Sequence, residues 1–79
     1  MRITYTHHAR QRMTQRKVSE EQVVETLESP DDVIPGNDGE EIAVKRYGAR
    51  EVRVVYEELD ENYFMIFTVM RPRVRNDYR

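Results

Sequence analysis

Apolar residues follow two different spacings along the chain, a helical one in the first third and an alternating one in the remainder. Between residues 7 and 17, Ala9 and Met13 lie four positions apart, and Thr6 is a suitable N-terminal cap. Residues four apart fall on one face of a helix, so this spacing predicts a short helix with a narrow buried stripe.

Stronger helix signals follow at residues 20–29. Ser19 can cap this helix, and Gln22 occupies the position that a reciprocal capping box requires. Valine and leucine side chains between these residues supply a buried face, and Pro30 is expected to end the helix at about Ser29.

After Pro30 the pattern becomes that of strands, which we predict at residues 32–35, 40–47, 50–59 and 63–70. Pro35 confines the first of these to an edge of the sheet. The last, YFMIFTVM, is apolar on both faces and therefore belongs in the middle. RITY, near the N-terminus, is compatible with one further strand.

These elements predict an α+β fold in which two N-terminal helices pack on an antiparallel sheet of three to four strands. With 79 residues the chain is expected to form a single domain, residues 1–79, with a basic tail at 71–79. Such a small domain buries only about 60% of the surface of its unfolded form. The chain has no cysteine, so neither a disulfide nor a thiolate metal site can reinforce it.

Two features bear on location. The opening residues, MRITYTHHAR, do not resemble a signal peptide, and the longest apolar run is far shorter than the ~20 residues that span a bilayer. We therefore expect no export by that route and no membrane insertion. The lack of cysteine fits a cytoplasmic location.

Charge is unevenly distributed, although the net charge is only −2. Residues 1–19 contain cations and no acid, residues 20–42 contain acids and no cation, and residues 63–79 contain four arginines and one aspartate. A fold that brings the two ends of the chain together would create a positive face backed by a negative one.

The first predicted helix carries a possible phosphate site. His8, Arg12 and Arg16 are spaced four apart and fall along one stripe. Like charges at this spacing oppose helix formation by a few tenths of a kcal/mol, which a bound anion would offset. Arginine matches phosphate oxygens with a planar fork of donors, and histidine exchanges protons near neutral pH.

Simpler explanations exist for these residues. Arginines near the C-terminus of a helix are favoured by its dipole without any ligand. Thr68 suits a strand because it is β-branched, and Tyr78 could stack on a base or lie on the surface. No set of histidines and carboxylates has the spacing of metal ligands, so we expect no metal and no other cofactor.

The sequence resembles a family of small bacterial and archaeal domains, domain of unknown function 4258. The resemblance rests on THHARQRMTQRKVS, VVETLESPDDV, the Tyr47–Gly48 step, VRVVYE and FTVMRP, and covers nearly the whole chain. It implies a fold related to the RelE and BrnT-like toxin nucleases, with helices on one face of a curved antiparallel sheet and a protein antitoxin as partner.

The resemblance also implies an activity, metal-independent cleavage of RNA through its own 2′-hydroxyl. Such a reaction needs a proton acceptor, a proton donor and cations around the phosphorus. The resemblance suggests His8 as base or acid, Arg12 and Arg16 as phosphate ligands, and Thr68 as a hydrogen-bond donor. Among the closing residues, Arg71, Arg73 and Tyr78 are the candidates for contacting the RNA.

Two other functions fit the same residues. The basic face could bind RNA, or an acidic protein segment, without any chemistry. Alternatively, the positive first helix could pair with the glutamate-rich second helix of another copy and form a homodimer.

Overall fold

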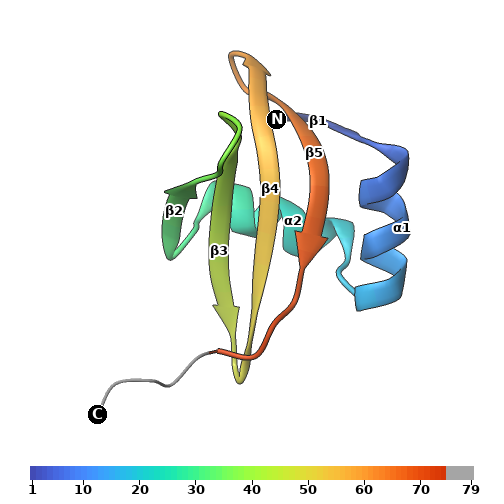
Figure 1. Ribbon diagram of the computed structural model, residues 1–79, viewed down its shortest axis with the longest axis vertical. Coiled ribbons are helices and arrows are strands. Elements are labelled where there is room, and N and C mark those ends of the chain that lie inside the picture. The colour runs from blue at the N-terminus through green and yellow to red at the C-terminus, as the bar shows by residue number, and fades with distance from the viewer. Residues whose placement is uncertain (75–79) are drawn as a thin grey trace.

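The computed structural model describes residues 1–74 and contains two helices and one five-stranded sheet. In chain order, the elements are β1 Arg2–Tyr5, α1 His7–Arg16, α2 Glu20–Glu28, β2 Asp32–Pro35, β3 Glu41–Tyr47, β4 Arg50–Asp60 and β5 Tyr63–Met70. The strands lie side by side in the order β1-β5-β4-β3-β2, as Figure 1 shows.

The expectation of an antiparallel sheet of three to four strands is wrong, although the fold is of the α+β class. β2, β3, β4 and β5 are antiparallel neighbours, but β1 pairs with β5 in parallel, from Arg2 opposite Tyr63 to Tyr5 opposite Ile66. β5 is apolar on both faces and so gains from a neighbour on each side. β1 supplies the second neighbour, which makes the sheet mixed and five-stranded.

Local capping interactions fix both helices. The Thr6 hydroxyl accepts a hydrogen bond from the Ala9 amide at the start of α1. At α2 the Ser19 hydroxyl accepts from the Gln22 amide, and the Gln22 side chain accepts from the Ser19 amide, which completes a capping box. These contacts satisfy amides that have no partner inside their helix.

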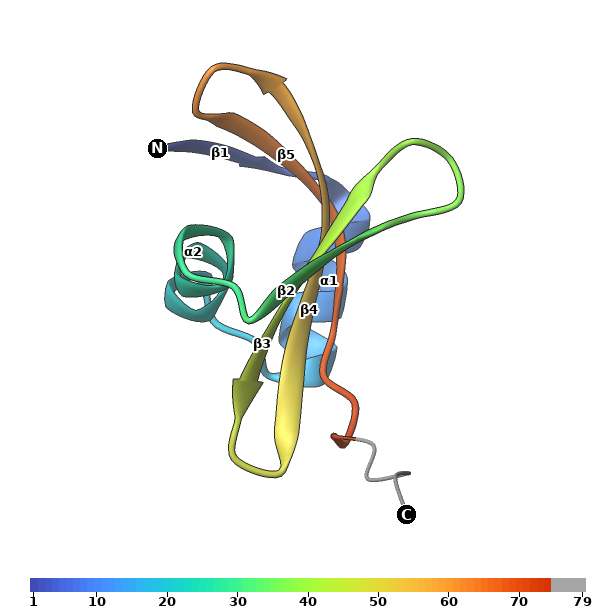
Figure 2. The ribbon, with the colours of Figure 1, turned by 90° about the vertical axis from the view of Figure 1, so that its left-hand side faces the viewer.

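The hydrophobic core lies between the helices and one face of the sheet, which we call the inner face. α2 passes behind β3 and β4, and α1 lies beside β5, as Figures 1 and 2 show. The buried residues of this core are Ala9, Met13, Val18, Val23, Val52, Val54, Ile66 and Val69. The opposite, outer face of the sheet is not covered by a helix (Figure 2).

A β-bulge at Phe67 connects the first helix to the centre of the sheet. Val55 pairs with Thr68 and Tyr56 with Ile66, so Phe67 is the extra residue. The Thr6 hydroxyl, which caps α1, also donates to the carbonyl of Phe67 at 3.1 Å. One side chain thus holds both the start of α1 and the bulge.

Within residues 1–74, none of the helices is long and apolar enough to span a membrane.

Candidate anion-binding site

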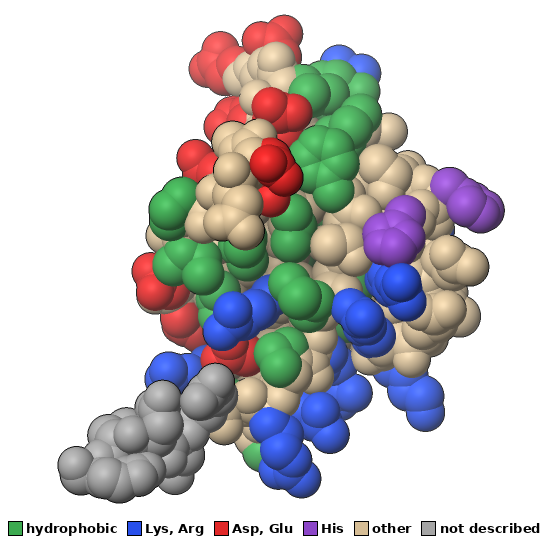
Figure 3. All heavy atoms as spheres, viewed as in Figure 1, with side chains coloured by type: hydrophobic (Ala, Val, Ile, Leu, Met, Phe, Trp, Pro, Cys, Tyr) green, Lys and Arg blue, Asp and Glu red, His purple; other side chains and the backbone are tan. Residues whose placement is uncertain are grey.

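An open depression of about 610 Å3 lies where the end of α1, the start of β4 and the chain leaving β5 meet. We call it the cation pocket. Its lining residues are Gln15, Arg16, Lys17, Arg50, Met70, Arg71 and Pro72. The lining therefore contains four cations and no carboxylate. In Figure 3, Lys and Arg side chains gather over the lower part of the molecule and Asp and Glu side chains toward the upper left.

Main-chain carbonyls orient two of the four cations. Arg16 donates from Nη1 to the carbonyl of Val69 at 2.8 Å, and Arg50 donates from Nη1 to the carbonyl of Arg71 at 3.2 Å. A guanidinium group has five N–H donors, so each of these contacts leaves donors for a ligand. The two side chains are therefore anchored without being neutralised.

Lys17 reaches the pocket from a strained backbone position. It is the C-terminal cap of α1 and has φ 57° and ψ 48°, in the left-handed region that glycine or asparagine usually occupies. Holding a lysine there costs roughly 1 kcal/mol relative to glycine. A lysine at this position is consistent with a use for its charge.

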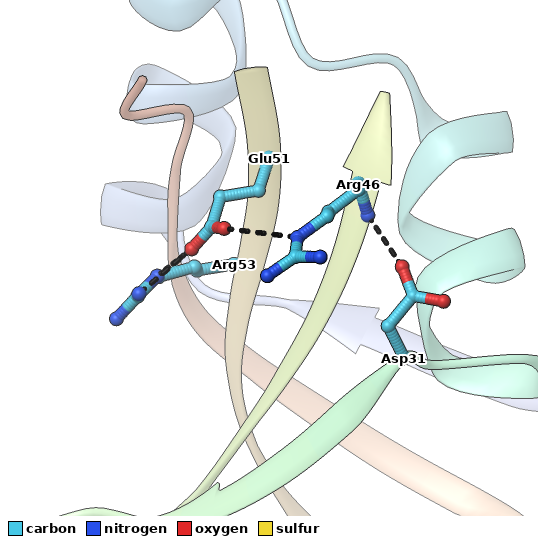
Figure 4. A network of polar contacts seen from close by, with 4 residues as sticks. All are labelled: Asp31, Arg46, Glu51 and Arg53. Carbon is cyan, nitrogen blue, oxygen red and sulfur yellow. Dashed lines mark hydrogen bonds and ion pairs between the residues drawn. The ribbon is translucent and has the colours of Figure 1, made fainter. Parts of the chain in front are cut away.

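Carboxylates neutralise other cations of the described chain but not those of the pocket. The ion pairs among residues 1–74 join Arg10 to Glu20, and Arg46 and Arg53 to Glu51. Figure 4 shows the second group: Glu51 is buried, with Arg53 at 2.7 Å and Arg46 at 4.0 Å. The same figure shows that the Asp31 carboxylate accepts a hydrogen bond from the backbone amide of Arg46. The cations near the positive end of the sheet thus include the internally paired Arg46 and Arg53 and, separately, the cations of the pocket.

The predicted helix stripe reaches the pocket at one end only. Arg16 lines the pocket, whereas His8 and Arg12 do not. His8 and Arg16 are eight residues apart on α1, about 12 Å along its axis. Arg12 donates from Nε to Nε2 of His8 at 3.3 Å and from Nη1 to Gln15 at 2.7 Å. In this arrangement Nε2 of His8 is the acceptor.

The other predicted site residues are distributed as follows. Arg71 lines the pocket beside Arg16, so the two ends of the chain do meet there. Arg73 is exposed and forms an isolated β-bridge with Arg50, outside the pocket lining. Thr68 lies on the outer face of β5 opposite Val55 and does not line the pocket. Tyr78 lies outside the described residues.

Sequence reasoning missed Arg50 as a site residue and gave Lys17 no role. Both lie at turns: Arg50 comes directly after the β3–β4 turn, where Gly48 has φ 65°, and Lys17 is the left-handed cap that ends α1. A cation next to a turn residue was the available signal. That Arg50 lies near Arg16 and Arg71 depends on tertiary structure, which the sequence does not reveal locally.

The pocket can bind an anion, but its lining offers no group that transfers protons near neutral pH. Tyr47, which the family resemblance also singles out, is not part of that lining. Burial, together with a 2.5 Å hydrogen bond to Glu25, raises the pKa of Tyr47 to about 12. Tyr47 therefore stays protonated at neutral pH. Among residues 1–74, no three potential ligands are grouped as a metal ion would require.

Comparison with known proteins gives one family. A model described as Domain of unknown function (DUF4258) matches residues 5–71, which is most of the chain. The matched segment runs from Tyr5 at the end of β1 to Arg71 in the cation pocket, and includes every lining residue except Pro72. No curated protein and no solved structure matches the chain.

Proposed function

Because the chain belongs to the Domain of unknown function (DUF4258) family, whose description assigns no activity, we propose from the site itself that this domain binds single-stranded RNA through its phosphates. The observation that carries the proposal is the cation pocket. Arg16, Lys17, Arg50 and Arg71 line one depression that has no carboxylate. Two of these groups are already oriented by main-chain carbonyls.

The chemistry of the pocket favours phosphate over other anions. A guanidinium fork forms paired hydrogen bonds with phosphate oxygens, and three of the four cations are arginines. The depression is open, which suits a polymer passing through better than a small molecule enclosed on all sides. An RNA ligand also fits the cytoplasmic location expected from the sequence.

The helix stripe extends the site in one direction. From Arg16 in the pocket, Arg12 and then His8 continue along α1. An RNA chain lying on this stripe would follow the positive end of a protein whose net charge is −2. The local charge thus supplies attraction that the whole molecule does not.

Affinity should be modest and dependent on salt. Contacts with three or four phosphates of a single strand predict a slope of log K against log salt of about −2 to −3. We expect dissociation constants in the range of roughly 1–100 μM at physiological salt, because contacts of this kind supply non-specific binding.

Fluorescence anisotropy with a labelled single-stranded RNA tests the proposal. Arg50→Gln should weaken binding about three- to tenfold and make the salt slope shallower by about 1. Arg2→Gln is the matched control: it removes the same charge from β1, where Arg2 lies over the ring of Tyr63. Equal losses in both variants, or binding only to DNA, would contradict the proposal.

Metal-independent RNA cleavage is a second candidate, and the contact between His8 and Arg12 favours it. His8 lies on the same stripe, and its Nε2 accepts from the Arg12 guanidinium in the protein without RNA. A bound phosphate would compete for Arg12 and release Nε2 as a base. By analogy with RelE-like toxin nucleases, such a nuclease would need a protein antitoxin to mask it.

Cleavage is tested on labelled RNA with a chelator present. His8→Ala should abolish cleavage, whereas His7→Ala, its neighbour about 100° away around the helix, should not. If the wild type binds RNA but releases no fragments at any pH between 5 and 9, the nuclease is excluded and binding remains. A short partner reading frame next to this one would support the antitoxin.

A further inference from the structure

The outer face of the sheet combines an apolar centre with oppositely charged ends. Side chains at its centre are half-buried although no helix covers them: Ile34, Ile42, Val55, Met65, Phe67 and Met70. In Figure 3, acidic side chains lie above this apolar region and basic side chains below it. The face is therefore polarised along the strands.

One row of residues crosses the sheet at the centre of this face. Ile34 pairs with Ile42, Ile42 with Val55, and Val55 with Thr68. Paired residues on neighbouring strands point to the same face, so these side chains form a continuous line perpendicular to the strands. We call it the central row.

Charges of opposite sign lie on β4 at equal distances from the central row. Arg53 is two residues before Val55 and Glu57 two residues after it, and the alternation of a strand puts all three side chains on the outer face. Arg53 and Glu57 are thus about 13 Å apart, with Val55 midway between them.

We propose that a second copy of this chain docks on the outer face, related by a two-fold axis that runs along the central row. Rotation about that axis places Val55 opposite its own copy and brings Arg53 of each chain over Glu57 of the other. The same patch serves both chains, as the symmetry of a two-fold interface requires. An unrelated partner would have to carry this charge pattern independently, whereas a second copy has it already.

A depression on the same face supports this arrangement. A depression of about 260 Å3 on the outer face is lined by Val55, Phe67 and three acids, Asp38, Glu40 and Glu57. Its mixed lining suits the long side chain of an arginine, with apolar walls for the methylene stem and carboxylates for the head. Arg53 of the second copy would enter it, and its contact with Glu51 leaves part of the guanidinium fork available.

The size of the face is adequate for a dimer. The five strands contain 4 to 11 residues each and 34 in total, which at about 3.3 Å per residue and 4.8 Å between strands offer roughly 540 Å2 in projection. Specific interfaces bury about 800 Å2 of accessible surface per partner, and accessible surface exceeds its projection. This proposal does not rest on the RNA site, because its residues lie outside the cation pocket except for Met70 at the rim.

Sedimentation equilibrium of the full chain between 1 and 200 μM tests the proposal. The wild type should be dimeric in the upper half of this range. Glu57→Arg places like charges opposite each other twice in the dimer and should raise the dimer dissociation constant at least tenfold. Glu58→Arg changes the net charge equally from the next position of the strand, which points away from the outer face, and should leave the constant within about twofold.

Circular dichroism melting should show both variants folded, because Glu57 and Glu58 are exposed. A wild type that stays monomeric at 200 μM overturns the proposal. So does a dimer that Glu57→Arg leaves intact, because its interface would then be elsewhere, for example between α1 and α2 of two copies.

Discussion

At the scale of single residues, the positive end of the molecule contains cations of two kinds. Arg46 and Arg53 lie against the buried carboxylate of Glu51, whereas Arg16 and Arg50 are held by carbonyl oxygens. A carbonyl orients a guanidinium group without cancelling its charge. The first kind contributes to folding, although the single carboxylate of Glu51 cannot neutralise both arginines, whereas the second has no carboxylate beside it among the described residues and keeps its whole charge for a ligand.

Replacing Glu51 tests the contribution of the first kind, Arg46 and Arg53, to folding. Glu51→Gln removes a buried negative charge from between two arginines and should lower the free energy of unfolding by about 1–3 kcal/mol. That range is below the values for fully buried pairs, because Arg53 is partly exposed and Arg46 largely so. Urea denaturation is the measurement. Glu61→Gln, exposed in the turn between β4 and β5, is the control and should change the midpoint little.

Tyr47 provides a prediction in alkaline solution. Burial and the hydrogen bond to Glu25 raise its pKa from 10.0 to about 12 in the folded protein. The folded state therefore binds the phenolic proton more tightly than the unfolded state does. The resulting stability is complete below pH 10 and is lost as the pH rises toward 12. Tyr47→Phe should reduce stability at neutral pH by about 0.5–1.5 kcal/mol and flatten this decline in urea titrations.

At the scale of elements, both helices are defined by their caps, and the end of α1 combines stability with function. Thr6, Ser19 and Gln22 satisfy amides at the helix starts, as their sequence pattern predicts. Lys17 departs from this pattern, because a left-handed cap favours glycine. We interpret the departure as a consequence of its place in the cation pocket.

Two substitutions of Lys17 separate these effects. Lys17→Gly should raise the free energy of unfolding by up to about 1 kcal/mol, because glycine adopts the left-handed conformation without strain. Lys17→Ala keeps most of the strain and should not raise it. Both variants should weaken RNA binding equally in anisotropy, since both remove the charge. Unchanged binding in both would show that the Lys17 charge has no part in it.

The helices and the antiparallel strands were predictable from the sequence because their signals are local: caps, apolar spacing and turn residues within a few positions. The pairing of β1 with β5 was not, since it joins residues about 60 positions apart and RITY is too short to show a clear period. Likewise, the sequence identified Arg16 and Arg71 as candidates. It did not reveal Arg50, whose neighbours in the pocket come from other elements.

At the scale of the whole molecule, the first residues complete the structure built by the last. β1 pairs with β5, and Ile3 and Tyr5 pack against the core. The cation pocket likewise combines α1 with the segment after β5. Fold and site both require residues 2–17 to meet residues 63–72.

Removal of residues 1–5 should therefore be severely destabilising. The truncated chain loses β1 and two partly buried side chains, each contributing up to about 1.5–3 kcal/mol. For a domain of this size we expect a loss of at least about 3 kcal/mol, seen as reduced ellipticity and a lower melting temperature in circular dichroism. A truncated chain that melts at the wild-type temperature would show that β1 contributes nothing to stability.

The side chains of Thr6, which caps α1, and of Arg16, at the end of α1, occupy the border of the sheet beyond the end of β1. Thr6 and Arg16 donate to the carbonyls of Phe67 and Val69, which would otherwise be open to another strand. The opposite border, β2, has four residues and ends at Pro35, which has no amide to donate. Filament growth by strand addition is therefore discouraged beside the second half of β5 and along β2, which favours stacking of the sheets of two copies over extension at these borders.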